Sequence, residues 1–247
     1  GGAMYVSFSA AIAADGHTRI KFNYAASSGG AAYFTELGVL YSKYKEAKLM
    51  EHIKLFWSRL NIRKMLKACE DSAQWEELTF LYLHYDEFDN AVLSMIAHPT
   101  EAFEHVKFKD TLAKVPNTEI FFKAITFYLE QSPLMLNDLL AVMAQRVDHV
   151  RVILQVRKAG HLPLVKPYLL STQPLNIKEV NDALYELYVL EEDHESLAAG
   201  VVEYTNFDAI EMAQQCEKLQ DGDLSGCFNI TDAGVREVAQ HCEQLQH

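Results

Sequence analysis

QWEELTFLYLHYDEFDNAVLSMI, residues 74–96, has the pattern of two short amphipathic helices joined by a tight turn. Apolar residues recur at spacings of three and four in each half, which places them on one helix face. They are Trp75, Leu78, Leu81, Tyr82 and Tyr85 in the first half, and Phe88, Val92, Met95 and Ile96 in the second. Asp86 lies between the halves, where a short carboxylate can cap the second helix, and Pro99 ends that helix. The segment predicts a helical hairpin.

The same pattern returns elsewhere in the chain. Phe34, Leu37, Leu40, Tyr41 and Tyr44 have the spacing of Trp75, Leu78, Leu81, Tyr82 and Tyr85, a third copy starts at Phe122, and a weaker fourth includes Leu184. From Tyr33 to Leu219 the pattern is helical, and no glycine occurs between Gly38 and Gly160. Helix pairs repeating every roughly 30 to 47 residues are typical of α-solenoids, in which each hairpin buries its apolar face against its neighbours. We therefore expect an all-α solenoid over residues 33–219.

Start and stop signals divide this region into helices. Asp148 is expected to open a helix that points Val152, Ile153 and Val156 inward and ends at Gly160. The other signals are Ser132 as an N-cap before Pro133, Asn176 with Glu179 as a capping box, Pro163 as a helix start with Pro167 as a kink, and Asn206 as the start of the last regular helix.

Both ends of the chain differ from this middle region. Residues 1–32 are rich in Gly, Ala and Ser, and alternating apolar residues flank Asp15-Gly16, which predicts either a β-hairpin or a foreign leader followed by a linker. Residues 220–247 change character again. Within them, Leu224-Ser225-Gly226-Cys227 and Ile230-Thr231-Asp232 resemble a single cysteine-containing leucine-rich repeat of the kind found in F-box proteins. One such repeat cannot form its own solenoid, so residues 220–247 are expected to be a fused segment or a helical cap.

Composition excludes several classes of function. The formal net charge of −12 disfavours nucleic-acid binding and anionic membranes. No uninterrupted apolar run reaches the roughly 18 residues of a membrane span, and Met4 to Ala14 lacks the basic flank of a signal peptide, so we expect an intracellular protein without membrane insertion. The four cysteines are expected to be reduced thiols.

No motif indicates catalysis, a cofactor or a metal. The sequence lacks a phosphate loop, a dinucleotide-binding glycine motif and a nucleophile elbow. Cys227 with His241-Cys242 lacks the second ligand pair of a zinc site. His149 is expected to belong to a capping turn and not to act as a base, and the carboxylates of Glu191-Glu192-Asp193 are expected to be solvated. We therefore expect a protein that is not an enzyme and has no cofactor or metal.

Several blocks of the middle region together resemble the clathrin heavy-chain family, in its proximal-leg repeats. They are Leu55-Phe56-Trp57-Ser58-Arg59, Phe88-Asp89-Asn90-Ala91, Phe108-Lys109-Asp110, Leu136-Asn137-Asp138-Leu139-Leu140 and Leu162-Pro163-Leu164-Val165-Lys166-Pro167-Tyr168. The resemblance covers about residues 33–210. It implies a leg strut of a vesicle coat, acting in endocytosis and intracellular transport on the cytoplasmic face of coated pits and coated vesicles. It also implies two partners, the clathrin light chain and other heavy-chain legs.

Two groups of basic residues stand out in this acidic chain. Arg63, Lys64 and Lys67 follow the Trp57 block, and Arg151, Arg157, Lys158 and Lys166 surround the Gly160 turn. They predict either ordinary solvated helix faces or an electropositive strip for an acidic partner helix such as a light chain. Arg63, Lys64, Lys67, Arg157, Lys158 and Lys166 are the candidate light-chain or lattice contacts. The alternative function is a generic helical-repeat interaction scaffold, including a ubiquitin-ligase adaptor, and a deep polar pocket would instead point to an enzyme.

Overall fold

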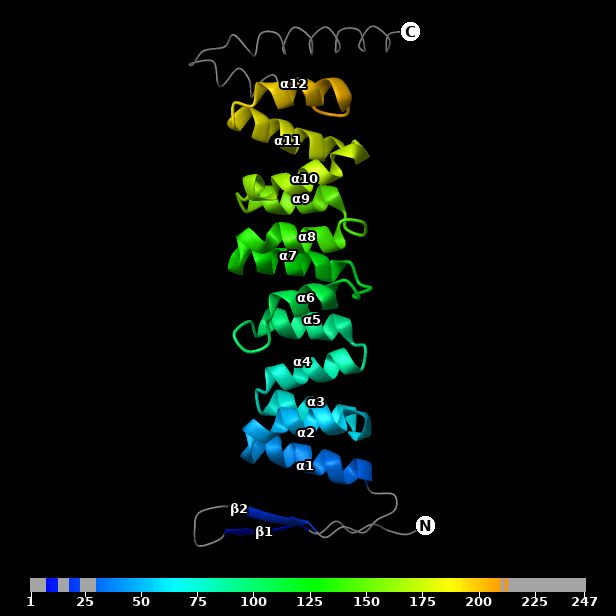
Figure 1. Ribbon diagram of the computed structural model, residues 1–247, viewed down its shortest axis with the longest axis vertical. Coiled ribbons are helices and arrows are strands. Elements are labelled where there is room, and N and C mark those ends of the chain that lie inside the picture. Colours follow the sequence, from blue (N-terminus) through cyan, green and yellow to red (C-terminus); the bar gives the residue numbers. More distant parts are fainter. Residues whose placement is uncertain (1–7, 13–17, 23–29, 210–211, 213–247) are drawn as a thin grey trace. The chain divides into compact units, whose positions relative to one another are not determined.

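A computed structural model describes residues 8–12, 18–22, 30–209 and 212 (Figure 1). The chain divides into two compact units, Gly1–Glu104 and His105–His247. Residues 220–247 lie outside the described residues, and with them the expected leucine-rich-repeat segment and the Cys227, His241 and Cys242 group. Among the described residues, no helix is both long enough and apolar enough to cross a bilayer.

Two strands precede the helices of the first unit. β1, Phe8–Ile12, pairs antiparallel with β2, Thr18–Phe22, with Phe8 opposite Phe22 and Ile12 opposite Thr18. This pairing follows the alternation of apolar residues in the sequence. The expected turn at Asp15-Gly16 lies between the strands and outside the described residues.

The first unit then continues as a stack of short helices. In chain order they are α1 Gly30–Tyr44, η1 Glu46–Lys48, α2 Leu49–Phe56, η2 Trp57–Arg59, α3 Ile62–Asp71, α4 Trp75–His84 and α5 Phe88–Ala97. α1 packs on α3, and α2 packs on α4. Their inward faces form one core that includes Ile53, Met65, Cys69 and Leu81, each fully buried. α4 and α5 are the hairpin expected over residues 74–96.

The second unit repeats this architecture. Its elements are α6 His105–Leu112, α7 Glu119–Gln131, η3 Pro133–Met135, α8 Leu136–Met143, α9 His149–Lys158, η4 Leu162–Val165, α10 Lys166–Thr172, η5 Gln173–Leu175, α11 Lys178–Leu190 and α12 His194–Glu203. α9 packs against both α7 and α11, and α8 packs against both α6 and α10, so the helices form two layers. Residues from both layers, such as Ile125, Leu140, Val156 and Leu184, meet in the core between them. The predicted all-α solenoid of stacked hairpins is confirmed.

Four helices end in the same way, with a residue in the left-handed backbone region. After α4, the N–H of Glu87 donates to the carbonyl of Tyr82 at 2.9 Å, which is the long hydrogen bond of a Schellman motif. The left-handed residues are Ala73 (φ 54°), Asp86 (φ 58°), Gly160 (φ 73°) and Glu192 (φ 57°). The expectation that Asp86 caps α5 is therefore wrong, because the N-cap position belongs to Glu87. Asp86 instead turns the chain at the end of α4.

The other capping signals are only partly confirmed. The Asp148 side chain accepts a hydrogen bond from the N–H of Arg151 at 3.2 Å, as expected for the N-cap of α9. Pro133 occupies the first turn of η3, but the Ser132 side chain makes no capping hydrogen bond. Pro167 lies in the first turn of α10, where backbone N–H groups have no acceptor within the helix. The N–H that proline lacks is therefore not needed there, so Pro167 starts this helix and does not kink it.

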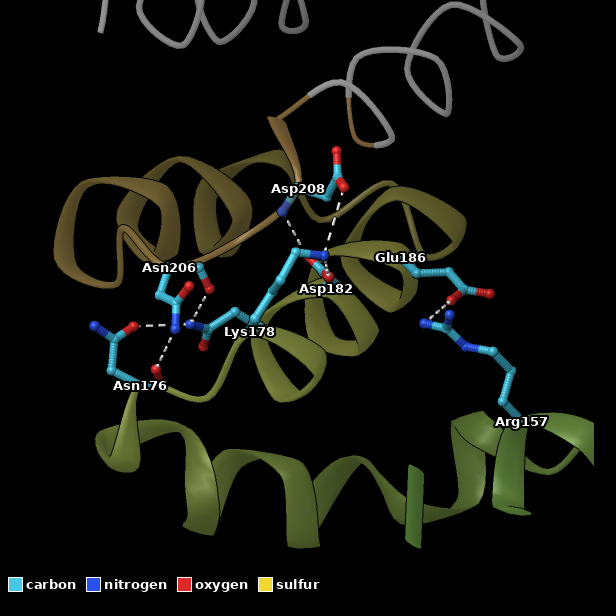
Figure 2. Close-up of polar contacts among 8 residues, drawn as sticks. Arg157, Asn176, Lys178, Asp182, Glu186, Asn206 and Asp208 are labelled. Carbon is cyan, nitrogen blue, oxygen red and sulfur yellow. Dashed lines mark hydrogen bonds and ion pairs between the residues drawn. The ribbon is translucent and has the colours of Figure 1, made fainter. Parts of the chain in front are cut away.

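Asn176 does not form the expected capping box. It adopts a left-handed conformation (φ 49°) after η5, and Ile177 takes the N-cap position of α11. The amide groups of Asn176, Asn181 and Asn206 join into one network, in which Asn181 Nδ2 donates to Asn176 Oδ1 and to the carbonyl of Asn206, both at 2.9 Å. Asn206 does not start a helix, and its side chain donates to the carbonyl of Asn176 (Figure 2). This network fastens the segment after α12 to the start of α11.

Candidate partner-binding surface

The basic group of the first unit lies on α3, whose sequence orients it. Asn61 caps α3 by accepting the N–H of Lys64 at 3.2 Å, and Met65, Ala68 and Cys69 point into the core. The remaining face carries Arg63, Lys64 and Lys67, all exposed. The ammonium of Lys64 pairs with Glu36 of α1. Within residues 30–209, Arg63 and Lys67 form no ion pair, so they are the cations of this group that remain open to a partner.

The basic group of the second unit is mostly engaged in ion pairs between repeats. Both guanidinium ends of Arg151 on α9 donate to the carboxylate of Glu119 on α7, at 2.6 and 2.8 Å. Arg157 on α9 pairs with Glu186 on α11 at 2.8 Å (Figure 2). Lys166 at the start of α10 pairs with Glu191. These contacts link neighbouring hairpins, and Lys158 is left exposed without an ion pair in the described part of the chain.

Electrostatics within these pairs follow from their geometry. The hydrogen bond from Arg151 lowers the pKa of Glu119, and the contact with Glu191 raises the pKa of Lys166. Arg151 also lies over the ring of Phe122, 3.7 Å from its centroid. Because solvent screens exposed charges, these pairs add little to the stability of the fold, although they do link adjacent helices.

An open groove of about 500 Å³ runs between the outer faces of α7 and α9. Its lining residues are Glu119, Phe122, Lys123, Thr126, Arg151, Leu154, Gln155 and Lys158. Gln155 fixes one wall by donating to the carbonyl of Phe122 at 3.0 Å. Leu154 is 57% exposed, although it is apolar. Since Arg151 and Glu119 neutralise each other, Lys123 and Lys158 give the groove, which also includes the exposed Leu154, a net positive charge.

Of the residues that line this groove, the sequence singled out Arg151 and Lys158 but not Lys123 or Leu154. Lys123 is a single cation among the aromatic residues of α7, without a basic neighbour to draw attention to it. Leu154 did carry a signal, because it falls off the inward stripe formed by Val152, Ile153 and Val156. An apolar residue on the wrong face of an amphipathic helix is a candidate contact residue.

Two histidines of the second unit, His105 and His149, are held in structural hydrogen bonds. His149, the first residue of α9, shares a 2.6 Å hydrogen bond with the hydroxyl of Tyr168, and burial lowers its pKa. His105 bridges the hydroxyl of Tyr128 at 2.8 Å and the carboxylate of Asp138 at 2.7 Å. Tyr128 is fully buried, so a substrate has no access to that end of the bridge. In the part of the chain that the structure describes, no three His, Cys, Asp or Glu residues are grouped to hold a metal ion.

Stacked helical hairpins define a helical-repeat protein of the α-solenoid class. A comparison with protein families makes this specific: residues 30–136 and 140–224 match the model described as a region in clathrin and VPS proteins. The chain belongs to this family. The match begins three residues before the expected start at residue 33 and extends five residues beyond the expected end at residue 219.

Individual relatives agree with the family match. The chain is 56% identical over 185 residues to "Clathrin heavy chain" of Dictyostelium discoideum and 52% identical over 185 residues to "Clathrin heavy chain 1" of Arabidopsis thaliana. It is 53% identical over 187 residues to "Clathrin heavy chain 2" of Homo sapiens. These matches cover 75–76% of this chain and 11% of each relative. The expected resemblance to clathrin heavy chain is confirmed.

Proposed function

We propose that this chain is a structural, non-enzymatic segment of a clathrin-type coat heavy chain. It acts as a leg strut in intracellular transport and endocytosis, on the cytoplasmic face of coated pits and coated vesicles. The observation that carries this proposal is the identity of 56% over 185 residues to a clathrin heavy chain. The hairpin stack also supports it, because it provides long outer faces for lateral contact. The strut is taken as the region that the family match covers, residues 30–136 and 140–224.

The proposed partners are the clathrin light chain and other heavy-chain legs. For the light chain, the groove between α7 and α9 has the features of a seat for an acidic amphipathic helix. Leu154 offers an apolar anchor, and Lys123 and Lys158 offer positive charge beside it. On α3, Arg63 and Lys67 offer a second point of contact. Lys64, Arg157 and Lys166 contribute less in this scheme, because their charges are paired with carboxylates of neighbouring helices.

Charge reversal in the groove tests the light-chain proposal. Replacing Lys123→Glu and Lys158→Glu together should weaken light-chain binding at low salt roughly tenfold, because each exposed charge pair contributes up to about 1 kcal/mol. Isothermal titration calorimetry at low and high salt measures the change, and the difference should shrink as salt screens the charges.

A matched control reverses two cations outside the groove. Lys54→Glu on α2 with Lys107→Glu on α6 makes the same change in net charge, and binding should stay close to that of the parent chain. Circular dichroism confirms that both variants keep their helices. Equal affinity for the groove variant and the parent at low salt, or an equal loss in both variants, would rule out the groove as the seat.

A further inference from the structure

The outer face of α8 and α10 is free of charge in a chain that is otherwise rich in it. The sequence has 34 acidic and 22 basic residues, yet residues 139–145 and 167–177 contain no Asp, Glu, Lys, Arg or His. The charged residues of the two helices stand at their starts, Asp138 in the first turn of α8 and Lys166 as the first residue of α10. Asp138 contacts His105 and Lys109, and Lys166 contacts Glu191.

The uncharged residues lie on two helices that pack against each other. On α8, Leu139, Leu140 and Met143 point into the core, so Ala141 and Val142 face outward. On α10, Tyr168, Leu169 and Thr172 are buried, so the opposite face is exposed. α8 and α10 are neighbours in one layer (Figure 1). The uncharged face consists of Ala141 and Val142 of α8, Gln145 just after it, Pro167, Leu170 and Ser171 of α10, and Pro174 and Leu175 of η5, which directly follows α10.

This face exposes a substantial apolar area. Val142 is 37% exposed, Leu170 44% and Leu175 59%. Contiguous exposed apolar surface commonly marks a site of protein contact, and the centres of such contacts are depleted of charged residues. The opposite layer differs, since the groove between α7 and α9 carries Lys123, Arg151 and Lys158. The two faces of the second unit are therefore suited to partners of different chemistry.

We propose that the uncharged face of α8 and α10 is the surface through which a second copy of this chain docks. Two copies that each carry a net charge of −12 repel one another, and an uncharged apolar face is where they can meet without burying like charges. A strongly basic or acidic partner gains nothing from a face without charge. This inference rests on one part of the proposed function, the contact with other heavy-chain legs. It adds that the uncharged face of α8 and α10 forms this contact. The face does not take part in light-chain binding.

Sedimentation equilibrium of the whole chain tests this inference. The weight-average mass should rise as the concentration increases toward about 1 mM, the range of a weak contact. Added salt should strengthen this association, because it screens the repulsion between copies and leaves the apolar contact intact. Light-chain binding in the charged groove should show the opposite dependence on salt.

Variants at exposed positions locate the contact. Leu170→Glu with Leu175→Glu places charge on the uncharged face and should keep the chain monomeric, with an unchanged circular dichroism spectrum. Leu190→Glu with Val202→Glu adds the same two charges at exposed positions outside both surfaces, so it is the matched control and should associate as the parent does. A parent chain that stays monomeric at every concentration and salt, or a double variant that associates like the parent, would overturn the inference. If the inference is overturned in this way while the double variant still binds light chain, only the proposed docking face is wrong, and the proposed light-chain binding stands.

Discussion

Ala73, Asp86 and Glu192 adopt a left-handed backbone conformation that favours glycine, and each ends a helix. For a residue with a Cβ, this conformation costs roughly 1–2 kcal/mol. Gly160 occupies the equivalent place after α9, and a Cβ built there would meet nothing within 4 Å. Ala73, Asp86 and Glu192 therefore pay a backbone strain energy that Gly160 avoids. At Gly160, a substitution would be strained by the positive φ and not by steric crowding.

Substitutions at these positions should change stability in opposite directions. Ala73→Gly relieves the left-handed strain, partly offset by the roughly 0.4–1 kcal/mol of added unfolded-chain entropy, and should raise Tm by about 1–3 °C. Gly160→Ala introduces the strain, partly offset by the lower entropy of the unfolded chain, and should lower Tm by about 1–3 °C. Thermal melting followed by circular dichroism measures both.

Ala199→Gly provides the control, because Ala199 lies inside α12, where glycine is unfavourable by up to about 1 kcal/mol. It should lower Tm, although the substitution is the same as at Ala73. A lower Tm for Ala73→Gly would mean that the left-handed position carries no strain.

The single side chain of His52 makes the free energy of unfolding depend on pH. It is 5% exposed, its Nε2 atom lies 2.8 Å from the carbonyl of Phe34, and burial lowers its pKa. A lowered pKa means that the folded state prefers the neutral imidazole. The stabilisation is complete above the unfolded pKa of about 6.5 and is lost as the pH falls through that value toward the folded pKa.

The contribution of His52 to the stability of the first unit should therefore be smaller at pH 5 than at pH 7.5, and the buried Glu77, whose pKa burial raises, acts in the opposite direction. The folded-state pKa of His52, followed through its imidazole protons by NMR, should lie below 6.5. His52→Gln keeps a side-chain N–H for the carbonyl of Phe34 and removes the titration, so its stability should vary less with pH. An imidazole that titrates above 6.5 in the folded chain would contradict this account.

Close contact between elements sets the geometry of the hairpin of α11 and α12. A Cβ added to Gly200 would lie 2.9 Å from Cε1 of Tyr185. Tyr185 has little freedom to move, because it is buried and its hydroxyl donates to the carbonyl of Tyr204 at 2.9 Å. Gly200 is thus the point at which α12 can approach α11 this closely.

Gly200→Ala should destabilise this hairpin by about 1–3 kcal/mol, the usual range for overpacking. Denaturant unfolding followed by tyrosine fluorescence measures the loss. Val202→Ala on the same helix is the control, because Val202 is 78% exposed and its truncation should be nearly neutral. A loss for Gly200→Ala no larger than that for Val202→Ala would show that α12 shifts freely to accommodate the methyl group.

Elements and their inward faces could be predicted from the sequence, but several of their ends could not. The apolar spacing of residues 74–96 gave α4 and α5, and Asp148 with Gly160 gave the limits of α9. The prediction that Asp86 caps α5 was wrong because a short polar residue between two helices can either cap the second helix or turn the chain after the first. The capping box predicted at Asn176 was wrong because the Asn176 side chain accepts a hydrogen bond from Asn181. Its main-chain carbonyl accepts another from Asn206, 30 residues away.

At the scale of the whole molecule, the sequence predicted the class and family but only part of the candidate surface. The basic groups were visible as clusters along the chain. The sequence did not show that these charges are neutralised. Lys64, Arg151 and Arg157 pair with carboxylates on adjacent helices, about one repeat away in sequence. The groove itself combines Lys123 of α7 with Leu154 and Lys158 of α9, and only the packing of two hairpins brings them together.

An exchange of segments measures the central claim, that this chain is a working strut of a clathrin coat. The 185 matched residues of the Dictyostelium discoideum heavy chain would be replaced by the corresponding residues of this chain, and cage assembly with light chain would be followed by light scattering and electron microscopy. We predict that the chimaera assembles into closed cages and retains light chain. A chimaera that folds, as judged by circular dichroism, but neither assembles nor binds light chain would contradict the account.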